Sequence, residues 1–181
     1  GMFRKGLKKR QRLKCLKKVL GEIGPAERCL LLTCGDNNGA MNFFLRQIGG
    51  IWSFADLEDI CLAEMKVLLG EPVVQVQEDG LPYADGTFDR IVCIDVHEHV
   101  DEPSIVSAET SRILKPGGQL IVTTPNGDEA KLAVRLKNAV GMSKEAYGHR
   151  RIGLTGEEIR ALLTRDNIET VQTLTFSRFF T

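Results

Sequence analysis

Short apolar runs alternate with longer segments of helical composition between residues 28 and 176, and this alternation constrains the fold more than any other feature. The apolar runs cover residues 29–33, 51–55, 73–76, 91–94, 120–124 and a Thr-rich stretch at 168–176. Segments of helical composition cover residues 39–47, 57–69, 103–114, 129–140 and 155–163. Strands that are buried on both faces and joined by crossover helices produce this pattern. The sequence therefore predicts an α/β fold with a doubly wound, mostly parallel sheet.

Two of the predicted helices begin with residues that can cap a helix. Asp101 and Ser104 lie at the start of the segment 103–114. Thr155 precedes the last segment and is followed by Glu157 and Glu158, so a cap and two acidic residues meet at one helix start. We expect these residues to set the first turns of both helices.

The charge distribution separates the start of the chain from the rest. The 24 basic and 24 acidic residues cancel, but residues 1–20 hold nine basic residues and no acidic one, which leaves a formal charge of −9 on the remainder. Leu13, Leu16 and Leu20 recur at helical spacing in this basic segment. We therefore expect a basic helical arm over residues 1–24 and one larger domain over residues 25–181.

Three roles can be considered for the basic arm. It can dock on the acidic domain as a lid, or it can bring residues 2–20 to an anionic membrane surface as a peripheral contact. Binding of nucleic acid fits the charge, but no base-stacking aromatic platform accompanies it, so we expect no nucleic-acid partner.

Several classes of protein are not expected from the composition. No apolar run approaches the 18 residues of a membrane span, and the arm lacks the apolar core of a secretory signal. The five cysteines are odd in number and form no C-x-x-C pair, which argues against a disulfide framework and a zinc knuckle. We expect a cytoplasmic protein with reduced thiols, with or without a peripheral membrane contact.

A glycine turn follows the first predicted strand. Gly35 and Gly39 have the spacing of the outer glycines of a nucleotide-binding turn, where backbone N–H groups approach a ligand. Asn37 lies between them and tolerates left-handed backbone angles. Asp56 closes the second strand, where a carboxylate can accept both hydroxyls of an adenosyl ribose. Dinucleotides and S-adenosylmethionine are the two cofactor classes that fit this arrangement.

Three downstream segments distinguish between these cofactors. They are residues 81–89 (LPYADGTFD), 95–100 (DVHEHV) and 114–118 (LKPGG). Together with the glycine turn, they resemble the class I S-adenosylmethionine-dependent methyltransferases, specifically the type 11 methyltransferase domains. The resemblance runs in register from about residue 29 to residue 126 and more loosely to residue 180. It implies a Rossmann-like methyltransferase sheet and methyl transfer from S-adenosylmethionine to a small-molecule acceptor, including one linked to a lipid or glycan.

The resemblance also implies which residues bind the cofactor. Thr33 occupies the position where the family has an acid, and Asn37 occupies a glycine position, so two marked positions of the first motif differ. The implied cofactor-binding residues are Thr33, Gly35, Asn37, Gly39, Asp56 at the ribose, Leu57 at the adenine, Gln77 with Glu78 at the adenine amino group, and Asp95 at the sulfonium end.

A general base is needed only when the methyl acceptor must lose a proton. His99 is the predicted catalytic residue, because it follows the fourth strand and an imidazole has a suitable pKa. Packing against the next helix is an equal alternative for His99. A metal site at His97 and Glu98 is not expected, since no third ligand stands at a recognisable spacing. The resemblance implies substrate contacts in the loop 141–153, where Tyr147, His149, Arg150 and Arg151 either recognise an acidic substrate or form a solvated loop.

Departures from the family pattern leave alternatives open. A non-catalytic methyltransferase-like binding or scaffolding protein fits Thr33, Asn37 and the short end of the chain, and a nicotinamide-dependent reductase is a third reading. The family sheet normally ends with a sixth strand and an antiparallel seventh. Residues 168–176 can form the sixth strand, but only five residues remain after it, so either the last antiparallel strand is missing or another segment replaces it. An unpaired edge of this kind can support a homodimer.

Overall fold

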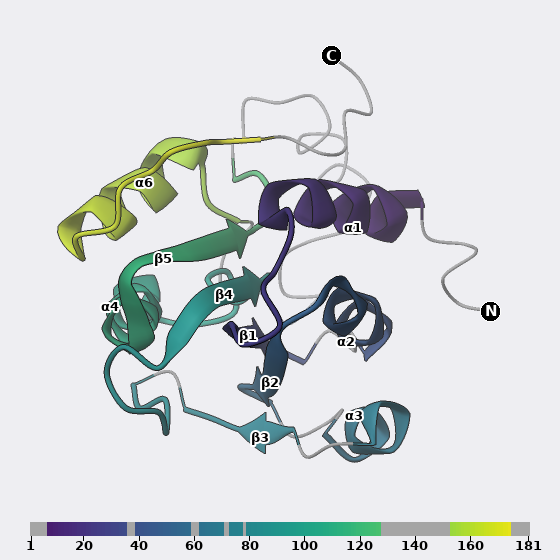
Figure 1. The fold of residues 1–181 in the computed structure, drawn as a ribbon. Coiled ribbons are helices and arrows are strands. Elements are labelled where there is room, and N and C mark those ends of the chain that lie inside the picture. The colour runs from purple at the N-terminus through teal and green to yellow at the C-terminus, as the bar shows by residue number, and fades with distance from the viewer. Residues whose placement is uncertain are drawn as a thin grey trace.

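A five-stranded parallel sheet forms the centre of the protein. The computed structural model describes residues 7–35, 39–58, 62–70, 73–77, 79–127 and 153–174. The strand order is β3-β2-β1-β4-β5, and every neighbouring pair is parallel (Figure 1). The strands are β1 (Arg28–Thr33), β2 (Ile51–Asp56), β3 (Val74–Gln75), β4 (Phe88–Ile94) and β5 (Leu114–Thr123). The predicted doubly wound α/β fold is confirmed, and the reversal of strand order falls between β1 and β4.

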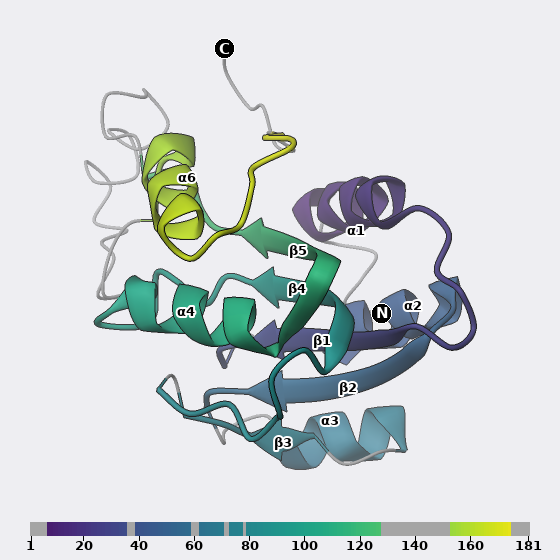
Figure 2. The ribbon, with the colours of Figure 1, turned by 60° about the vertical axis from the view of Figure 1, so that its left-hand side comes forward.

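Helices cover both faces of this sheet (Figure 2). They are α1 (Leu7–Leu20), α2 (Gly39–Leu45) continued by the 3-10 turn η2 (Arg46–Ile48), α3 (Leu62–Leu69), α4 (Pro103–Ile113) and α6 (Gly156–Arg165). Successive residues of β1 point to opposite faces, as in any strand. Leu31 packs in the cluster that holds residues of α1 and α2, whereas Leu30 and Leu32 pack in the cluster that holds residues of α4.

The helix α1 is packed into the core of the sheet. Leu16 and Leu20 are 3% and 2% exposed and share a cluster with residues of β1, β2 and β4. The carbonyl groups at the end of α1 accept hydrogen bonds from the sheet: Arg90 Nη1 donates to Leu20 O over 2.9 Å, and Gln119 Nε2 donates to Val19 O over 3.1 Å. These side chains satisfy carbonyls that a helix end leaves without partners. The helix is thus attached to the sheet by its apolar stripe and by its carboxyl end.

The opposite face of α1 carries the charge. Arg10, Lys14, Lys17 and Lys18 are exposed, because Leu13, Leu16 and Leu20 face the sheet. Among the helices that the structure describes, none is long and apolar enough to cross a membrane.

The last predicted strand is not a strand. Residues 168–174 have no strand assignment, and Val171 is 90% exposed. The backbone at Ile168 turns back to α6 instead, where its N–H donates to Leu163 O over 2.9 Å. A Thr-rich sequence forms a strand only when another strand lies alongside, and in the described part of the chain β5 pairs with β4 only. The prediction for 168–176 was therefore wrong over its described residues.

Two local predictions change in detail, and a third is confirmed. The strand β5 begins at Leu114 rather than at residue 120, because the Pro-Gly-Gly segment lies in a register shift between Phe88 and Arg90 of β4. Glu102, not Asp101 or Ser104, is the cap residue of α4, and it makes no side-chain capping bond. Thr155 and Glu158 do form a reciprocal capping box at α6. The helix predicted at 129–140 lies outside the described residues.

Candidate functional site

The glycine turn and the acid after β2 meet at the carboxyl edge of the sheet. The strand register places Thr33, the last residue of β1, beside Asp56, the last residue of β2. Gly35 follows with φ +60°, and its N–H donates to Asp56 Oδ1 over 2.8 Å. An added Cβ at Gly35 would approach Glu58 Oε2 to 3.2 Å. The positive backbone angle therefore favours glycine at this position, and any larger residue would also have to displace the Glu58 side chain.

The side chain of Asp56 joins the segments that meet at this edge of the sheet. It is 1% exposed, and its carboxylate accepts from three groups: Gly35 N–H and Glu58 N–H at Oδ1, both over 2.8 Å, and Thr33 Oγ1 at Oδ2 over 2.5 Å. Three bonds leave about one of the four acceptor positions of a carboxylate open. Thr33, at the position where the resemblance implies an acid, thus orients the predicted ribose acid directly.

The other predicted cofactor residues lie along the same edge where the structure describes them. Gly39 begins α2. Leu57 is partly buried and packs against the core cluster that contains residues of α4. Gln77 is exposed beyond β3, next to Val76, whose N–H donates to Asp56 O over 2.9 Å. The structure therefore brings Thr33, Gly35, Asp56, Leu57 and Gln77 to neighbouring strand ends. Asn37 and Glu78 lie outside the described residues.

Asp95 follows β4 in a strained backbone conformation. Its φ is +51°, which an aspartate adopts at a cost, and its N–H donates to Thr123 O over 2.9 Å. The carboxylate is held from two directions: Oδ1 accepts from Thr123 Oγ1 over 3.0 Å, and Oδ2 forms an ion pair with Arg12 Nη1 over 2.6 Å. The helix α1 thereby contributes a cation to the end of β4.

Glu98 is a functional candidate that the sequence analysis did not identify. It is fully buried, and Thr124 Oγ1 donates to its Oε2 over 3.3 Å. Within the described part of the chain, its Oε1 is buried without a hydrogen-bond partner. Burial, reinforced by the negative charge of Asp95, raises the pKa of Glu98 from 4.5 to about 8. Glu98 is therefore mostly a neutral acid at pH 7.

The two histidines after β4 have different surroundings. His97 is fully buried, with Nε2 3.2 Å from Ser107 Oγ of α4 and Nδ1 3.8 Å from Cys93 Sγ. It therefore joins β4 to α4 inside the core. His99 is half-buried, and its N–H closes a turn by donating to Val96 O over 2.9 Å. No group of three or more His, Cys, Asp and Glu side chains that could hold a metal ion occurs in the described ranges.

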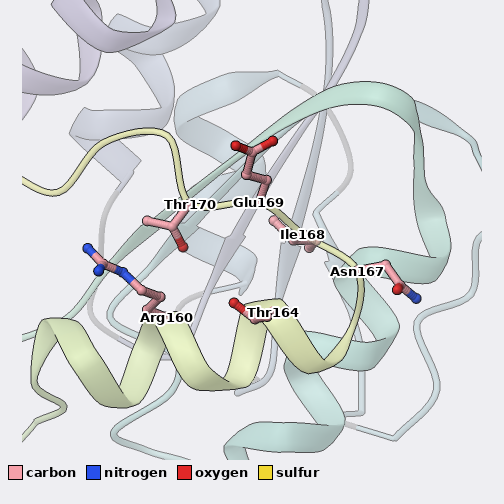
Figure 3. A pocket seen from close by; sticks show the side chains of 6 residues that line it. All are labelled: Arg160, Thr164, Asn167, Ile168, Glu169 and Thr170. Atoms are coloured by element: carbon pink, nitrogen blue, oxygen red, sulfur yellow. The ribbon is translucent and has the colours of Figure 1, made fainter.

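A separate hollow lies at α6 (Figure 3). Its lining consists of side chains from α6 and from the segment that follows it, namely Arg160, Thr164, Asn167, Ile168, Glu169 and Thr170. None of the predicted cofactor residues lines it. The predicted substrate contacts at Tyr147, His149, Arg150 and Arg151 lie outside the described residues.

The sequence offered no signal that would single out Arg12. It is one of nine cations in the first 20 residues, and its partner Asp95 is distant in the chain. Glu98 lies in the segment 95–100 that carries the resemblance, but its burial is not indicated by the sequence, since acidic side chains are rarely buried.

Comparison with known proteins identifies the family. A model described as a methyltransferase domain matches residues 32–122, which is half of the chain. The ubiquinone biosynthesis O-methyltransferase of Xanthomonas oryzae pv. oryzae is 36% identical over 66 residues, covering 36% of this chain and 28% of that protein. The protein of the same name from Xanthomonas campestris pv. campestris is 28% identical over 121 residues, covering 64% of this chain and 50% of that protein. The chain thus spans half or less of the length of these two relatives.

Solved structures show the same fold. An S-adenosylmethionine-dependent methyltransferase of Thermotoga maritima superposes with a TM-score of 0.67 and 24% identity, covering 93% of this chain and 77% of that one. The geranyl diphosphate C-methyltransferase of Streptomyces coelicolor, solved with S-adenosyl-L-homocysteine, gives a TM-score of 0.65 and 17% identity, covering 87% and 60%. The chain therefore belongs to the methyltransferase domain family, and it has the fold of S-adenosylmethionine-dependent methyltransferases.

Proposed function

We propose that this protein transfers a methyl group from S-adenosylmethionine to a small-molecule acceptor. The observation that carries the proposal is the position of Asp56, which is buried at the end of β2 and bonded to the Gly35 N–H of the glycine turn. The residues fit the cofactor, since glycine leaves room at the turn and the Asp56 carboxylate keeps an acceptor position for a ribose hydroxyl. Leu57 and Gln77 are proposed at the adenine.

The groups at the end of β4 suit the sulfonium end of S-adenosylmethionine. When bound, S-adenosylmethionine supplies a methyl group on a positively charged sulfonium. The Asp95 carboxylate, which is paired with Arg12, and the carbonyl and hydroxyl oxygens of Thr123 are proposed to lie at this end of the site. The residues need to align an acceptor in line with the methyl group, because the sulfur leaves as a neutral thioether.

We propose that the acceptor atom is an oxygen and that His99 removes its proton. Two relatives that match part of the chain are named O-methyltransferases, which supports an oxygen acceptor. His99 is half-buried in the turn after β4, near the proposed sulfonium end, whereas His97 is used in the core. Turnover that falls in His99→Gln, with unchanged affinity for S-adenosylhomocysteine, would support this role.

Calorimetric titration with S-adenosylhomocysteine tests the proposed function. We expect a saturable site with a dissociation constant in the micromolar range, and NAD and NADP as matched adenosine-containing controls should give no saturable heat. Absence of S-adenosylhomocysteine binding up to millimolar concentration would contradict the proposal. Saturable binding of NAD alone would favour a reductase.

We also propose a peripheral contact between the exposed face of α1 and anionic membranes. This face presents Arg10, Lys14, Lys17 and Lys18, while Leu16 and Leu20 are buried against the sheet. The contact is therefore expected to be electrostatic and weakened by salt, rather than an insertion of the apolar stripe. Flotation with phosphatidylglycerol vesicles should show binding at low salt that is lost when the four side chains are replaced by glutamine. Equal flotation of the protein and this variant would argue against the contact.

A further inference from the structure

The ion pair between Arg12 and Asp95 joins α1 to the proposed sulfonium end of the site. The two side chains are 17% and 11% exposed, and Arg12 Nη1 lies 2.6 Å from Asp95 Oδ2. Leu16 and Leu20 of the same helix are buried in the sheet, so the helix cannot carry Arg12 away without exposing its apolar stripe. The structure thus holds one cation in a defined place beside this carboxylate.

Asp95 is the charged acid at this point, because Glu98 beside it is mostly neutral at pH 7. Asp95 and the fully buried Glu98 lie together after β4, and the charge of Asp95 acts on Glu98. Glu98 Oε1 has no hydrogen-bond partner among the described residues. A ligand that presents positive charge at the end of β4 would therefore meet the carboxylate that Arg12 already holds.

The methyl donor and the product of the proposed reaction differ by one charge at this position. S-adenosylmethionine has a positively charged sulfonium, and S-adenosylhomocysteine has a neutral thioether. The Arg12 guanidinium offsets the attraction between the Asp95 carboxylate and a sulfonium and does not affect a neutral thioether, and in a buried site this difference is screened little by solvent. The pair of ligands is otherwise closely matched in shape.

We infer that Arg12 is a specificity-determining residue, which competes with the cationic end of the methyl donor for Asp95 and so weakens binding of the charged donor relative to the neutral product. This inference rests on the proposed function, because it takes Asp95 to lie beside the sulfur. Arg12 acts through Asp95 and is in this sense a positioning residue. After methyl transfer, the neutral product leaves the Arg12–Asp95 pair intact.

Titration of both ligands into the full chain without an acceptor tests this inference. The measured quantity is the ratio of the two dissociation constants, S-adenosylmethionine over S-adenosylhomocysteine. In Arg12→Gln this ratio is expected to fall at least about fivefold. In Arg12→Lys, which keeps the charge, and in Arg10→Gln, which removes an exposed charge of the same helix, it should stay within twofold of the original value.

A double-mutant cycle shows whether Arg12 acts through Asp95. In an Asp95→Asn background, Arg12→Gln should change the ratio less than twofold. Circular dichroism and thermal unfolding report whether each variant is folded. The ratio of the two dissociation constants does not change when the same fraction of protein is inactive in both titrations. If Arg12→Gln weakens the binding of both ligands by the same factor, Arg12 has only a structural role and the inference is wrong. The inference is also wrong if both ligands bind to this variant and the ratio of their dissociation constants is unchanged. If the unsubstituted protein binds neither ligand, the proposed function itself fails.

Discussion

Replacing Asp56 with alanine is expected to weaken binding of S-adenosylhomocysteine at least about 100-fold, and to lower the free energy of unfolding by about 2–4 kcal/mol. The affinity falls because the proposed ribose acceptor is lost. The stability falls because the Gly35 and Glu58 N–H groups and the Thr33 hydroxyl lose the carboxylate that accepts from them. Calorimetry with S-adenosylhomocysteine and urea unfolding measure the two effects.

Asp56→Asn separates these two effects. Its side-chain oxygen can accept from the two N–H groups, and its amide nitrogen can donate to Thr33 Oγ1, so stability should fall by only about 1 kcal/mol. The affinity should still fall at least about tenfold, because the charged acceptor is gone. Glu22→Ala removes an exposed acid and serves as the control, with both quantities unchanged. Affinity that survives in Asp56→Ala would place the cofactor elsewhere in the molecule.

Replacing Glu98 with glutamine is expected to remove a large pH dependence of stability. The pKa of Glu98 is raised to about 8 in the folded protein, against 4.5 when the side chain is unfolded in water. Between these values the folded state keeps a proton that the unfolded state has released, so stability falls as pH rises from about 4.5 to 8 and then levels off. The loss is on the order of 4–5 kcal/mol across this range.

Urea unfolding from pH 5 to pH 8.5 checks this expectation. Glu98→Gln should be at least as stable as the original protein at pH 8.5, and the difference between the two should shrink toward pH 5. The acids Glu27, Asp89 and Glu109 have lowered pKa values, so their contributions are lost at pH values below this range. Parallel pH profiles of the two proteins would show that Glu98 is ionised in the fold or exposed to water.

The strand pattern and the glycine turn were predictable because they depend on local sequence. Residues buried on both faces must be apolar throughout, which makes the runs at 29–33 and 91–94 recognisable without a structure. A turn that needs positive φ requires glycine, as at Gly35, and the Thr155 capping box lies within four residues. Of these features, the glycine turn also contributes to the resemblance to the methyltransferase domain family.

The strand predicted at 168–176 shows the limit of local signals. A Thr-rich, apolar segment has the composition of a strand whether or not a partner strand exists. In the described residues, the chain after α6 instead turns back to Leu163 and leaves Val171 exposed. Strand formation depends on hydrogen bonds to another segment, and single-sequence reasoning does not supply that segment.

The sequence by itself determined the parallel sheet, and it predicted that Gly35 and Asp56 lie at the carboxyl edge of that sheet, where the structure joins them by a hydrogen bond. Only the tertiary structure decided which of the cations at the start of the chain reaches the site and which carboxyl is buried beside it. Arg12 lies beside Asp95 because the apolar stripe of α1 packs on the sheet. The pKa of Glu98 is raised because its side chain is buried away from water. Electrostatic pairing depends on distance in space and on burial, and neither is written in the order of residues.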